Sequence, residues 1–432
     1  MPFPLLDWAE RFIATPSVSR DGNLEIAERA AELLASVGLE HRFDEVEIDG
    51  VRHRNVIADL GPEPGGPDGV LLVTHLDTVP PGEPAAWTAT DGDPFQPTRD
   101  GDRLYGLGAA DAKVDLVCKV AALAQLDPAE LSRPIRLVGT FAEEIGLRGA
   151  RRLIETGGAS EFGYALIGEP SELVCVRAHK GYAVFEASLP VVQERVRGNW
   201  ESIEHFDGES AHSSTPHLGK NAIEAALRRV AEIDNAAIAD FSGGEAVNQV
   251  PDRCTLAIGS GYPQEPLFEF LCAWRRLRME LPAQQDPDFD PDHSVANLGR
   301  VEFREGRPVF TFDLRPVPGV DPLEVVRPLE ECAMLEPLRV NPPLETARGA
   351  DLIRAVVSAQ QSLGLGERVG TKATSTEAGI FSAAGLETVV IGAGVSVGNV
   401  HRPNEHTLIS QLEVMCELYR ETLRRLACEA GA

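Results

Sequence analysis

Cysteine is scarce in this chain and irregularly spaced. The seven cysteines stand at positions 118, 175, 254, 272, 332, 416 and 428, an odd number with no C-x-x-C pair. This pattern argues against a disulfide framework and against a zinc site built from thiolates, and it is typical of a reducing compartment. We therefore expect a cytoplasmic protein.

Long apolar runs and several common motifs are also lacking. No run approaches the ~20 apolar residues of a membrane-spanning helix. The start of the chain contains Asp7 and lacks the basic segment of a signal peptide. Neither a P-loop, nor GxGxxG after a strand, nor a GxSxG elbow occurs. Membrane-bound, nucleotide-dependent and serine-hydrolase functions thus have no support in the sequence.

Positive charge is in short supply. Asp and Glu total 67 against 40 Lys and Arg, which gives a net charge of −27. Such a surface repels phosphate backbones and anionic membranes, so neither is expected as a partner. Only five basic residues are lysines. Four of them, Lys113, Lys180, Lys220 and Lys372, lie in motif-bearing segments, which suggests that a compact ammonium group is required there.

The 432 residues exceed one ordinary domain, and their hydropathy pattern divides them. Apolar strands that alternate with helices predict a doubly wound, mostly parallel α/β domain formed by residues 1–179 and 339–432. Residues 180–338 alternate more like antiparallel strands and predict a smaller α+β domain inserted into the larger one. Within it, the acidic, proline-rich segment 284–294 is expected to be a surface excursion. The expected helices cover 5–37, 109–126, 148–157, 222–233, 323–333, 352–364 and 409–427, and the expected strands cover 51–60, 69–79, 135–144, 164–170, 182–190, 254–262, 308–316 and 387–395.

Metal-competent side chains collect in five segments. Four of them stand at predicted strand ends and carry His75, Asp111, the pair Glu143–Glu144, and Glu169, while the fifth carries His401 after a Gly-rich loop. In an open α/β sheet, residues beyond the carboxyl ends of the strands meet at one edge. Two imidazoles and several carboxylates without a thiolate suit two Zn²⁺, Co²⁺ or Mn²⁺ ions.

Each segment alone has an ordinary explanation as well. Asp77 lies on the same side of the strand as His75 and could accept the N–H of a metal-bound imidazole, but such a pair can also be simply solvated. Asp111 is predicted to open a helix, where an N-cap aspartate is common. Glu143 and Glu144 point to opposite faces, so that one can bind a metal while the other acts as a base. The co-occurrence of all five segments favours a metal site.

In this order the segments resemble the di-zinc hydrolase family of acetylornithine deacetylase, succinyl-diaminopimelate desuccinylase and carboxypeptidase G. The resemblance extends from IATPSVS near the start to HRPNEH near the end. It implies a catalytic α/β domain interrupted by a lid or dimerisation domain, and a homodimer. It also implies that His75, Asp111 and Glu169 hold one metal ion, that Asp111, Glu144 and His401 hold the other, that Glu143 is the general base, and that Asp77 orients His75.

Three residues of the inserted domain match family positions near the substrate. His212 in AHSSTPHLGKN matches a histidine that donates to the oxyanion, often from the partner subunit, and His217 is a competing candidate. Asn248 and Arg315 match positions near the substrate carboxylate or backbone. Arg315 can equally form an ordinary salt bridge on a strand.

The substrate class depends on residues 370–379. Desuccinylases usually carry an arginine here that suits a second carboxylate. This chain lacks it, and Thr376-Glu377-Ala378 looks like the acetylornithine deacetylase pattern. Glu377 can pair with a cationic side chain or can be a helix-start acid favoured by the helix dipole. Lys372 can instead attract an anionic group, which keeps a desuccinylase open.

Three departures from the family pattern affect lid shape and substrate fit, and none removes a ligand. Ala142 stands where an aspartate is common, Val114-Asp115 where small residues are usual, and the region 260–308 is longer than in most members. We expect a metal-dependent amidohydrolase of a small N-acyl amino acid or dipeptide, with N-acetylornithine as the first candidate. Desuccinylase, aminoacylase and dipeptidase activities are alternatives, as is a metal-binding protein without catalysis.

Overall fold

The computed structural model describes residues 3–63, 65–192, 196–233, 235 and 237–428. Its contacts divide the chain into two compact units. Unit 1 comprises Met1–Ala178, Leu344–Thr371 and Thr376–Ala432, and unit 2 comprises His179–Pro343 and Lys372–Ser375. The division of labour between a catalytic domain and a lid stays a prediction.

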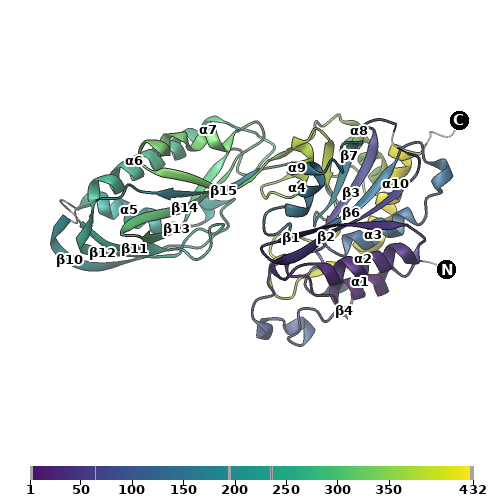
Figure 1. The fold of residues 1–432 in the computed structure, drawn as a ribbon, viewed down its shortest axis with the longest axis horizontal. Coiled ribbons are helices and arrows are strands. Elements are labelled where there is room, and N and C mark those ends of the chain that lie inside the picture. The colour runs from purple at the N-terminus through teal and green to yellow at the C-terminus, as the bar shows by residue number, and fades with distance from the viewer. Residues whose placement is uncertain (1–2, 64, 193–195, 234, 236, 429–432) are drawn as a thin grey trace. The chain divides into compact units, whose positions relative to one another are not determined.

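Unit 1 is built on one mixed sheet with the strand order β1-β2-β6-β3-β7-β18-β8-β16, and β17 pairs with β8 (Figure 1). The strands are β1 (His41–Ile48), β2 (Val51–Leu60), β3 (Gly69–His75), β6 (Ile135–Thr140), β7 (Phe162–Gly168), β8 (Cys175–His179), β16 (Leu344–Glu345), β17 (Val369–Lys372) and β18 (Glu387–Val390). The central strands β6, β3, β7 and β18 run parallel, and antiparallel strands flank them. The predicted α/β class with a mostly parallel central sheet is confirmed.

Helices cover both faces of this sheet. They are α1 (Leu5–Ile13), α2 (Leu24–Ser36), α3 (Asp115–Leu123), α4 (Arg148–Glu155), α8 (Asp351–Ser362), α9 (Ala378–Ala383) and α10 (Ile409–Ala427). Val70 and Leu72 of β3 belong to the core under α1, α2, α3, α8 and α10. Leu71 and Val73 belong to the core under α4 and α9. Burial on both faces explains why this strand is apolar at successive positions.

A small sheet in unit 1 joins distant segments. Its strand order is β19-β5-β4, with β4 (Thr98–Asp100), β5 (Arg103–Tyr105) and β19 (His406–Leu408). His406 pairs with Tyr105 across β19 and β5. This pairing holds the segment that ends at Glu405 beside the Gly-rich segment that begins at Gly106.

Two predicted helices of unit 1 are shorter than expected. The region 5–37 forms α1 and α2, separated by a turn that contains the 3₁₀ helix Ser19–Asp21. The region 109–126 becomes helical only at Asp115, and Asp111 lies in the turns before it, so the prediction that Asp111 opens a helix was wrong. Strand β1 was not predicted, because it is a charged edge strand without a buried residue and so lacks an apolar pattern.

Unit 2 is an antiparallel sheet with the order β10-β12-β11-β13-β14-β9-β15, and α5 and α6 pack against it (Figure 1). The strands are β9 (Tyr182–Ser188), β10 (Val196–Asp207), β11 (Ala237–Gly243), β12 (Arg253–Pro263), β13 (Val295–Arg304), β14 (Arg307–Arg315) and β15 (Met334–Asn341), and the helices are α5 (Ala222–Glu232), α6 (Gln264–Glu280) and α7 (Pro322–Val326). Phe270 of α6 stacks on Phe310 with ring centroids 4.4 Å apart, and Trp274 meets Phe312 edge-on at 5.4 Å. The long region 260–308 therefore contains a core helix and the inner strand β13.

The segment 284–294 is less exposed than its composition suggests. Phe289 is only 5% exposed. The Lys180 Nζ donates to the carbonyls of Pro291 and His293 at 2.7 Å each. Lys180 thus anchors this loop to unit 2, while Gln284, Gln285, Pro287, Asp290 and Asp292 stay exposed, as expected of a surface excursion.

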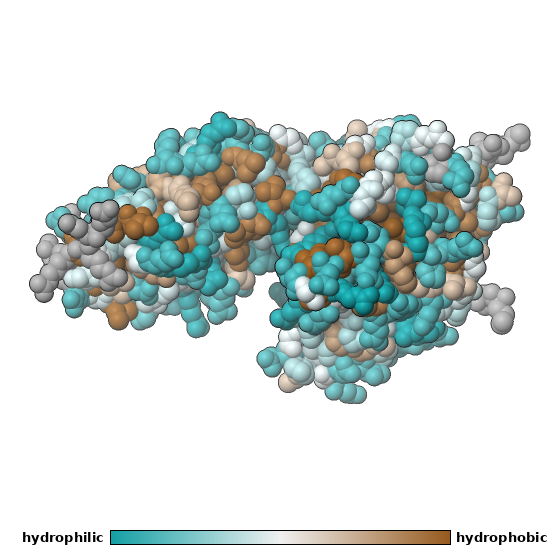
Figure 2. Space-filling view, in the orientation of Figure 1, coloured by the Kyte–Doolittle hydropathy of each residue, from teal (hydrophilic) through white to brown (hydrophobic). Residues whose placement is uncertain are grey.

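Polar side chains dominate the visible surface of both units, with scattered apolar patches between them (Figure 2). Among the described residues, no helix has both the length and the apolar character that crossing a membrane requires.

Candidate metal centre

Three neighbouring strands bring predicted site residues to one edge of the sheet of unit 1. His75 is the last residue of β3, Glu169 directly follows β7, and the pair Glu143–Glu144 lies in the turn after β6. These strands are parallel and adjacent, so their carboxyl ends meet.

Asp111 joins these residues to His401 and forms two candidate ligand groups. His75 Nε2 lies 3.1 Å from Asp111 Oδ1 and 3.7 Å from Glu169 Oε1. His401 Nε2 lies 3.0 Å from Asp111 Oδ2 and 3.1 Å from Glu144 Oε1. In each group the ligand-competent atoms all lie within 4.8 Å of one another. Asp111 therefore offers one carboxylate oxygen to each group, as a bridging ligand must.

The ring of His75 is held in the orientation that metal binding needs. Its Nδ1 lies 3.0 Å from the backbone carbonyl of Asp77, which can only accept a hydrogen bond. Nδ1 therefore donates a proton to this carbonyl, and Nε2 faces Asp111, where it would release its own proton to bind a metal. Burial tends to lower the pKa of His75, but its contacts with Asp111 and Asp77 raise it well above its usual value. The sequence predicted that Asp77 orients this ring, and its carbonyl makes the contact.

The Asp77 carboxylate, whose Oδ1 lies 3.7 Å from His75 Nδ1, also contacts the backbone of the acidic pair. Its Oδ1 accepts from the backbone N–H of Glu143 at 3.0 Å, and its Oδ2 lies 3.3 Å from the N of Glu144. The Ser19 hydroxyl also donates to Oδ2, at 2.5 Å. Asp77 thus fixes the turn that presents Glu143 and Glu144.

The electrostatics of the site reflect crowded acids around two imidazoles. Burial raises the pKa of Glu143 well above its usual value, and Glu144, Glu169 and Asp77 raise it further against the opposing effect of His75. Burial tends to lower the pKa of His401, but its contacts with Asp111 and Glu144 raise it to about 11. Divalent cations would relieve this repulsion among the acids, so the donor set fits metal ions.

Glu405 was missed by the sequence reasoning although it lies in the HRPNEH segment. Its Oε1 accepts from the backbone N–H groups of Gly108, Ala110 and Asp111 at 3.0, 3.0 and 3.1 Å. It is 1% exposed. Glu405 therefore shapes the loop that carries Asp111. No signal in the sequence singled it out, because its contacts join segments that lie far apart along the chain.

Glu377 lies inside unit 1. It is fully buried and its Oε2 accepts from the Thr140 hydroxyl at 2.9 Å, at the end of β6. It stands directly before α9. This position agrees with the helix-start explanation, and the substrate-pairing role stays a prediction.

The predicted residues of unit 2 gather around one segment, 211–214. His212 forms a β-bridge with Gln249, and the Ser213 N–H donates to the Asn248 carbonyl at 3.0 Å. The His212 Nδ1 accepts from the Ser214 backbone N–H at 3.2 Å. Because that N–H can only donate, the neutral imidazole carries its proton on Nε2. His212 can therefore act as a donor, whereas the competing His217 lies on a separate 3₁₀ turn, Pro216–Leu218.

Arg315 supports the same segment from below. Its Nε lies 3.1 Å from Asp313 Oδ2, its Nη2 donates to the Ser213 hydroxyl at 3.1 Å, and its guanidinium stacks over Tyr182 at 3.8 Å. Ser213 also donates to Asp313. Arg315 is 4% exposed, which agrees with the salt-bridge alternative.

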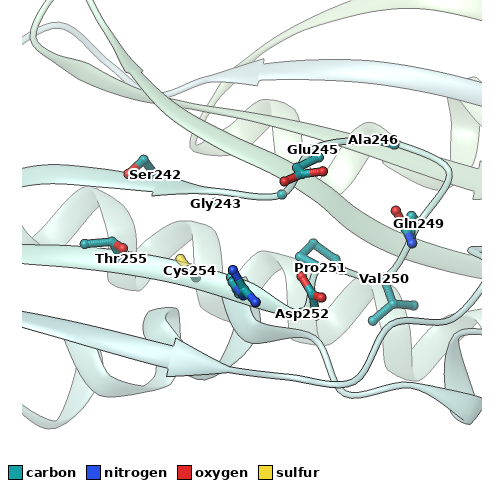
Figure 3. Close-up of a pocket in the computed structure, with 12 residues that line it drawn as sticks. Ser242, Gly243, Glu245, Ala246, Gln249, Val250, Pro251, Asp252, Cys254 and Thr255 are labelled. Carbon is teal, nitrogen blue, oxygen red and sulfur yellow. The ribbon is translucent and has the colours of Figure 1, made fainter. Parts of the chain in front are cut away.

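The connection between β11 and β12 borders a cavity of about 490 Å³ (Figure 3). Glu245 and Asp252 contribute carboxylates, and Gln249 lies beside them. The described residues that line the cavity include no histidine. It thus lacks the mixture of imidazole and carboxylate found in unit 1.

Comparisons with known proteins agree with this geometry. A family model described as Peptidase family M20/M25/M40 matches residues 71–425. An acetylornithine deacetylase of Myxococcus xanthus is 26% identical over 424 residues, which cover 94% of this chain and 92% of that protein. An acetylornithine deacetylase of Pasteurella multocida is 35% identical, over 49% of this chain and 50% of that protein. The structure of aminoacylhistidine dipeptidase from Vibrio alginolyticus shares the fold, with a TM-score of 0.69 at 17% identity over 99% of this chain and 98% of that one.

Proposed function

The chain belongs to peptidase family M20/M25/M40 and is a metallohydrolase of amide or peptide bonds, and we propose that it deacylates a small N-acyl amino acid with two metal ions. The best candidate substrate is N-acetylornithine. The observation that carries this proposal is the sharing of Asp111 between two ligand groups, with Glu143 close enough to interact with His75, Glu144 and Glu169.

We assign His75, Asp111 and Glu169 to one ion and Asp111, Glu144 and His401 to the other, and we propose Zn²⁺, with Co²⁺ or Mn²⁺ as substitutes. When bound, the two cations would lower the pKa of a water molecule and polarise the amide carbonyl. In this mechanism Glu143 accepts the proton of the attacking water and returns it to the leaving amine. Asp77 holds the backbone of Glu143 in place for both transfers.

Donors from unit 2 complete the proposal. The Nε2–H of His212 would stabilise the oxyanion, from the same chain or from a homodimer partner. Asn248 and Arg315 are proposed near the substrate carboxylate, with Arg315 acting through Ser213 as well. We also propose that the enzyme works in the cytoplasm as a homodimer.

The proposed substrate rests on the relatives named acetylornithine deacetylase and on Glu377 in the TEA segment. A succinylated diamino acid is the alternative, with Lys372 as the anion-attracting group. Aminoacylase and dipeptidase activities follow the same chemistry.

The test is a panel of N-acetyl, N-succinyl and dipeptide substrates, assayed with added Zn²⁺ or Co²⁺. Fastest turnover of N-acetylornithine supports the proposal, and a preference for succinylated diamino acids would reassign the substrate. Full activity in the metal-free protein would overturn the role of the metals.

The variant Glu143→Ala separates an enzyme from a metal-binding protein without catalysis. It should keep both metals and lose about 10²–10⁴-fold in turnover, as the loss of a general base predicts. Unchanged turnover would refute the role of Glu143. A wild-type protein that binds metal and hydrolyses nothing in the panel would favour the non-catalytic alternative.

A further inference from the structure

A buried polar cluster lies on the opposite side of the strand ends from His75. Thr74 of β3, Asp115 and Lys119 of α3, and Tyr419 of α10 are 0%, 7%, 0% and 1% exposed. Asp115 Oδ2 accepts from the Thr74 hydroxyl at 2.8 Å and pairs with Lys119 Nζ at 2.9 Å. The Tyr419 hydroxyl lies 2.8 Å from Asp115 Oδ1. We call these four residues the strand-end cluster.

The strand-end cluster contacts the backbone directly before two candidate ligands. Lys119 Nζ donates to the Val73 carbonyl at 2.6 Å and lies 2.8 Å from Thr74 Oγ1, next to His75. A Cβ on Gly168 would lie only 1.8 Å from Asp115 Oδ2, so the carboxylate packs against the backbone that precedes Glu169.

The same cluster reaches two further elements. The Tyr419 hydroxyl lies 2.9 Å from the Ile391 carbonyl, just after β18. Asp115 is the first residue of α3 and follows Asp111 by a single turn segment. The residues before His75 and Glu169 thus contact one buried carboxylate, and the residue that carries it follows Asp111 closely along the chain.

Apolar packing at these positions would hold the helix on the sheet equally well. A buried ion pair is a poor source of stability, because desolvation offsets much of the attraction. Directional contacts instead fix the relative positions of the groups they join. The position of this ion pair beside the strand ends that carry the ligands therefore indicates that it fixes the positions of those strand ends.

We propose that the strand-end cluster positions the first ligand group, with Asp115 as the central positioning residue. None of its members belongs to either candidate ligand group. They act by holding the backbone from which His75 and Glu169 project. This inference rests on the proposed function in one respect, namely that His75, Asp111 and Glu169 bind a metal.

The test compares tyrosine variants that each lose one buried hydroxyl. Tyr419→Phe removes a contact of Asp115, whereas the control Tyr262→Phe removes a bond to the Pro190 carbonyl in unit 2, 2.9 Å long. Co²⁺ affinity and the visible spectrum of the Co²⁺-loaded protein are measured for both, together with turnover and thermal stability. Tyr419→Phe should bind Co²⁺ about tenfold more weakly with an altered spectrum, as for residues that orient ligands. The control should match the wild type.

Thr74→Val and the double variant Asp115→Asn/Lys119→Met extend the test. The double variant avoids an unpaired buried charge, so it is expected to fold, and its Co²⁺ affinity should fall at least as far. Wild-type affinity and spectra in all folded cluster variants would overturn the proposal while leaving the proposed function intact. A wild-type protein that binds no Co²⁺ would refute both.

Discussion

At the scale of single residues, Glu405 tests how the Asp111 loop is held. Glu405→Ala leaves three buried N–H groups without their acceptor. Each such group lowers the free energy of unfolding by at most about 1–3 kcal/mol. We expect lower thermal stability and metal affinity reduced about 10–100-fold. Glu405→Gln keeps an acceptor oxygen and should lose much less of both. Equal metal affinity in the alanine variant and the wild type, measured by titration calorimetry, would contradict this role.

Glu377 gives a pH dependence of stability with a definite sign. Burial raises the pKa of Glu377 to about 7 from its usual value of 4.5. An acid whose pKa is higher in the folded state than in the unfolded state stabilises the fold at pH values below its unfolded pKa. This contribution is lost as the pH rises through the folded pKa. In the metal-free protein, the free energy of unfolding should therefore fall between about pH 4.5 and pH 7 relative to Glu377→Gln. Urea unfolding of both proteins at several pH values checks this, and parallel curves would contradict it.

At the scale of elements, the sequence predicted best where periodicity and burial agree. The apolar run 69–73 is buried on both faces and was recognised as a central strand. Helix α6 was missed because its apolar residues are interrupted by arginines and its neighbours are acidic and proline-rich. The residues before Asp115 were predicted to be helical, and the alanines among them do have high helix propensity. In the structure the hydrogen bonds to Glu405 hold these residues in turns. The candidate metal ligands could be predicted because they follow strand ends. The contacts by which Glu405 and Asp115 hold these ligands in place could not, because they join residues far apart in sequence.

Helix α6 offers a matched pair of aromatic residues. Trp274 is 1% exposed, contacts Phe312 and donates to Glu224 Oε1 at 3.1 Å, whereas Phe268 on the same helix is 48% exposed. Trp274→Ala should cost about 3–5 kcal/mol of unfolding free energy. Phe268→Ala should change it by less than about 1 kcal/mol. Denaturant unfolding distinguishes the two, and similar losses would mean that α6 does not pack as described.

At the scale of the whole molecule, three of the five lysines have a common use. Lys113, Lys119 and Lys180 are fully buried, and each donates to backbone carbonyls of a distant segment. Lys119 lay outside the set singled out by motifs, and Lys220, inside that set, has a side chain that is 72% exposed and pairs with Glu209. Burial therefore distinguishes the lysines that donate to backbone carbonyls more clearly than their position in a motif does. A compact ammonium group on a flexible stem suits carbonyl contacts where little space surrounds the nitrogen.

The substitution of lysine by arginine tests this use directly. Lys113 Nζ donates to the Thr15 carbonyl at 2.9 Å. A Cβ on Gly108 would lie 2.4 Å from its Cε, so the stem is tightly enclosed. Lys113→Arg should therefore lower the free energy of unfolding by about 1–3 kcal/mol through overpacking and should reduce turnover, because Asp111 is close in sequence. The exposed control Lys220→Arg should stay within about 0.5 kcal/mol of the wild type. Unchanged stability of Lys113→Arg in denaturant unfolding would show that the interior tolerates either cation and that the scarcity of lysine has no structural cause at this position.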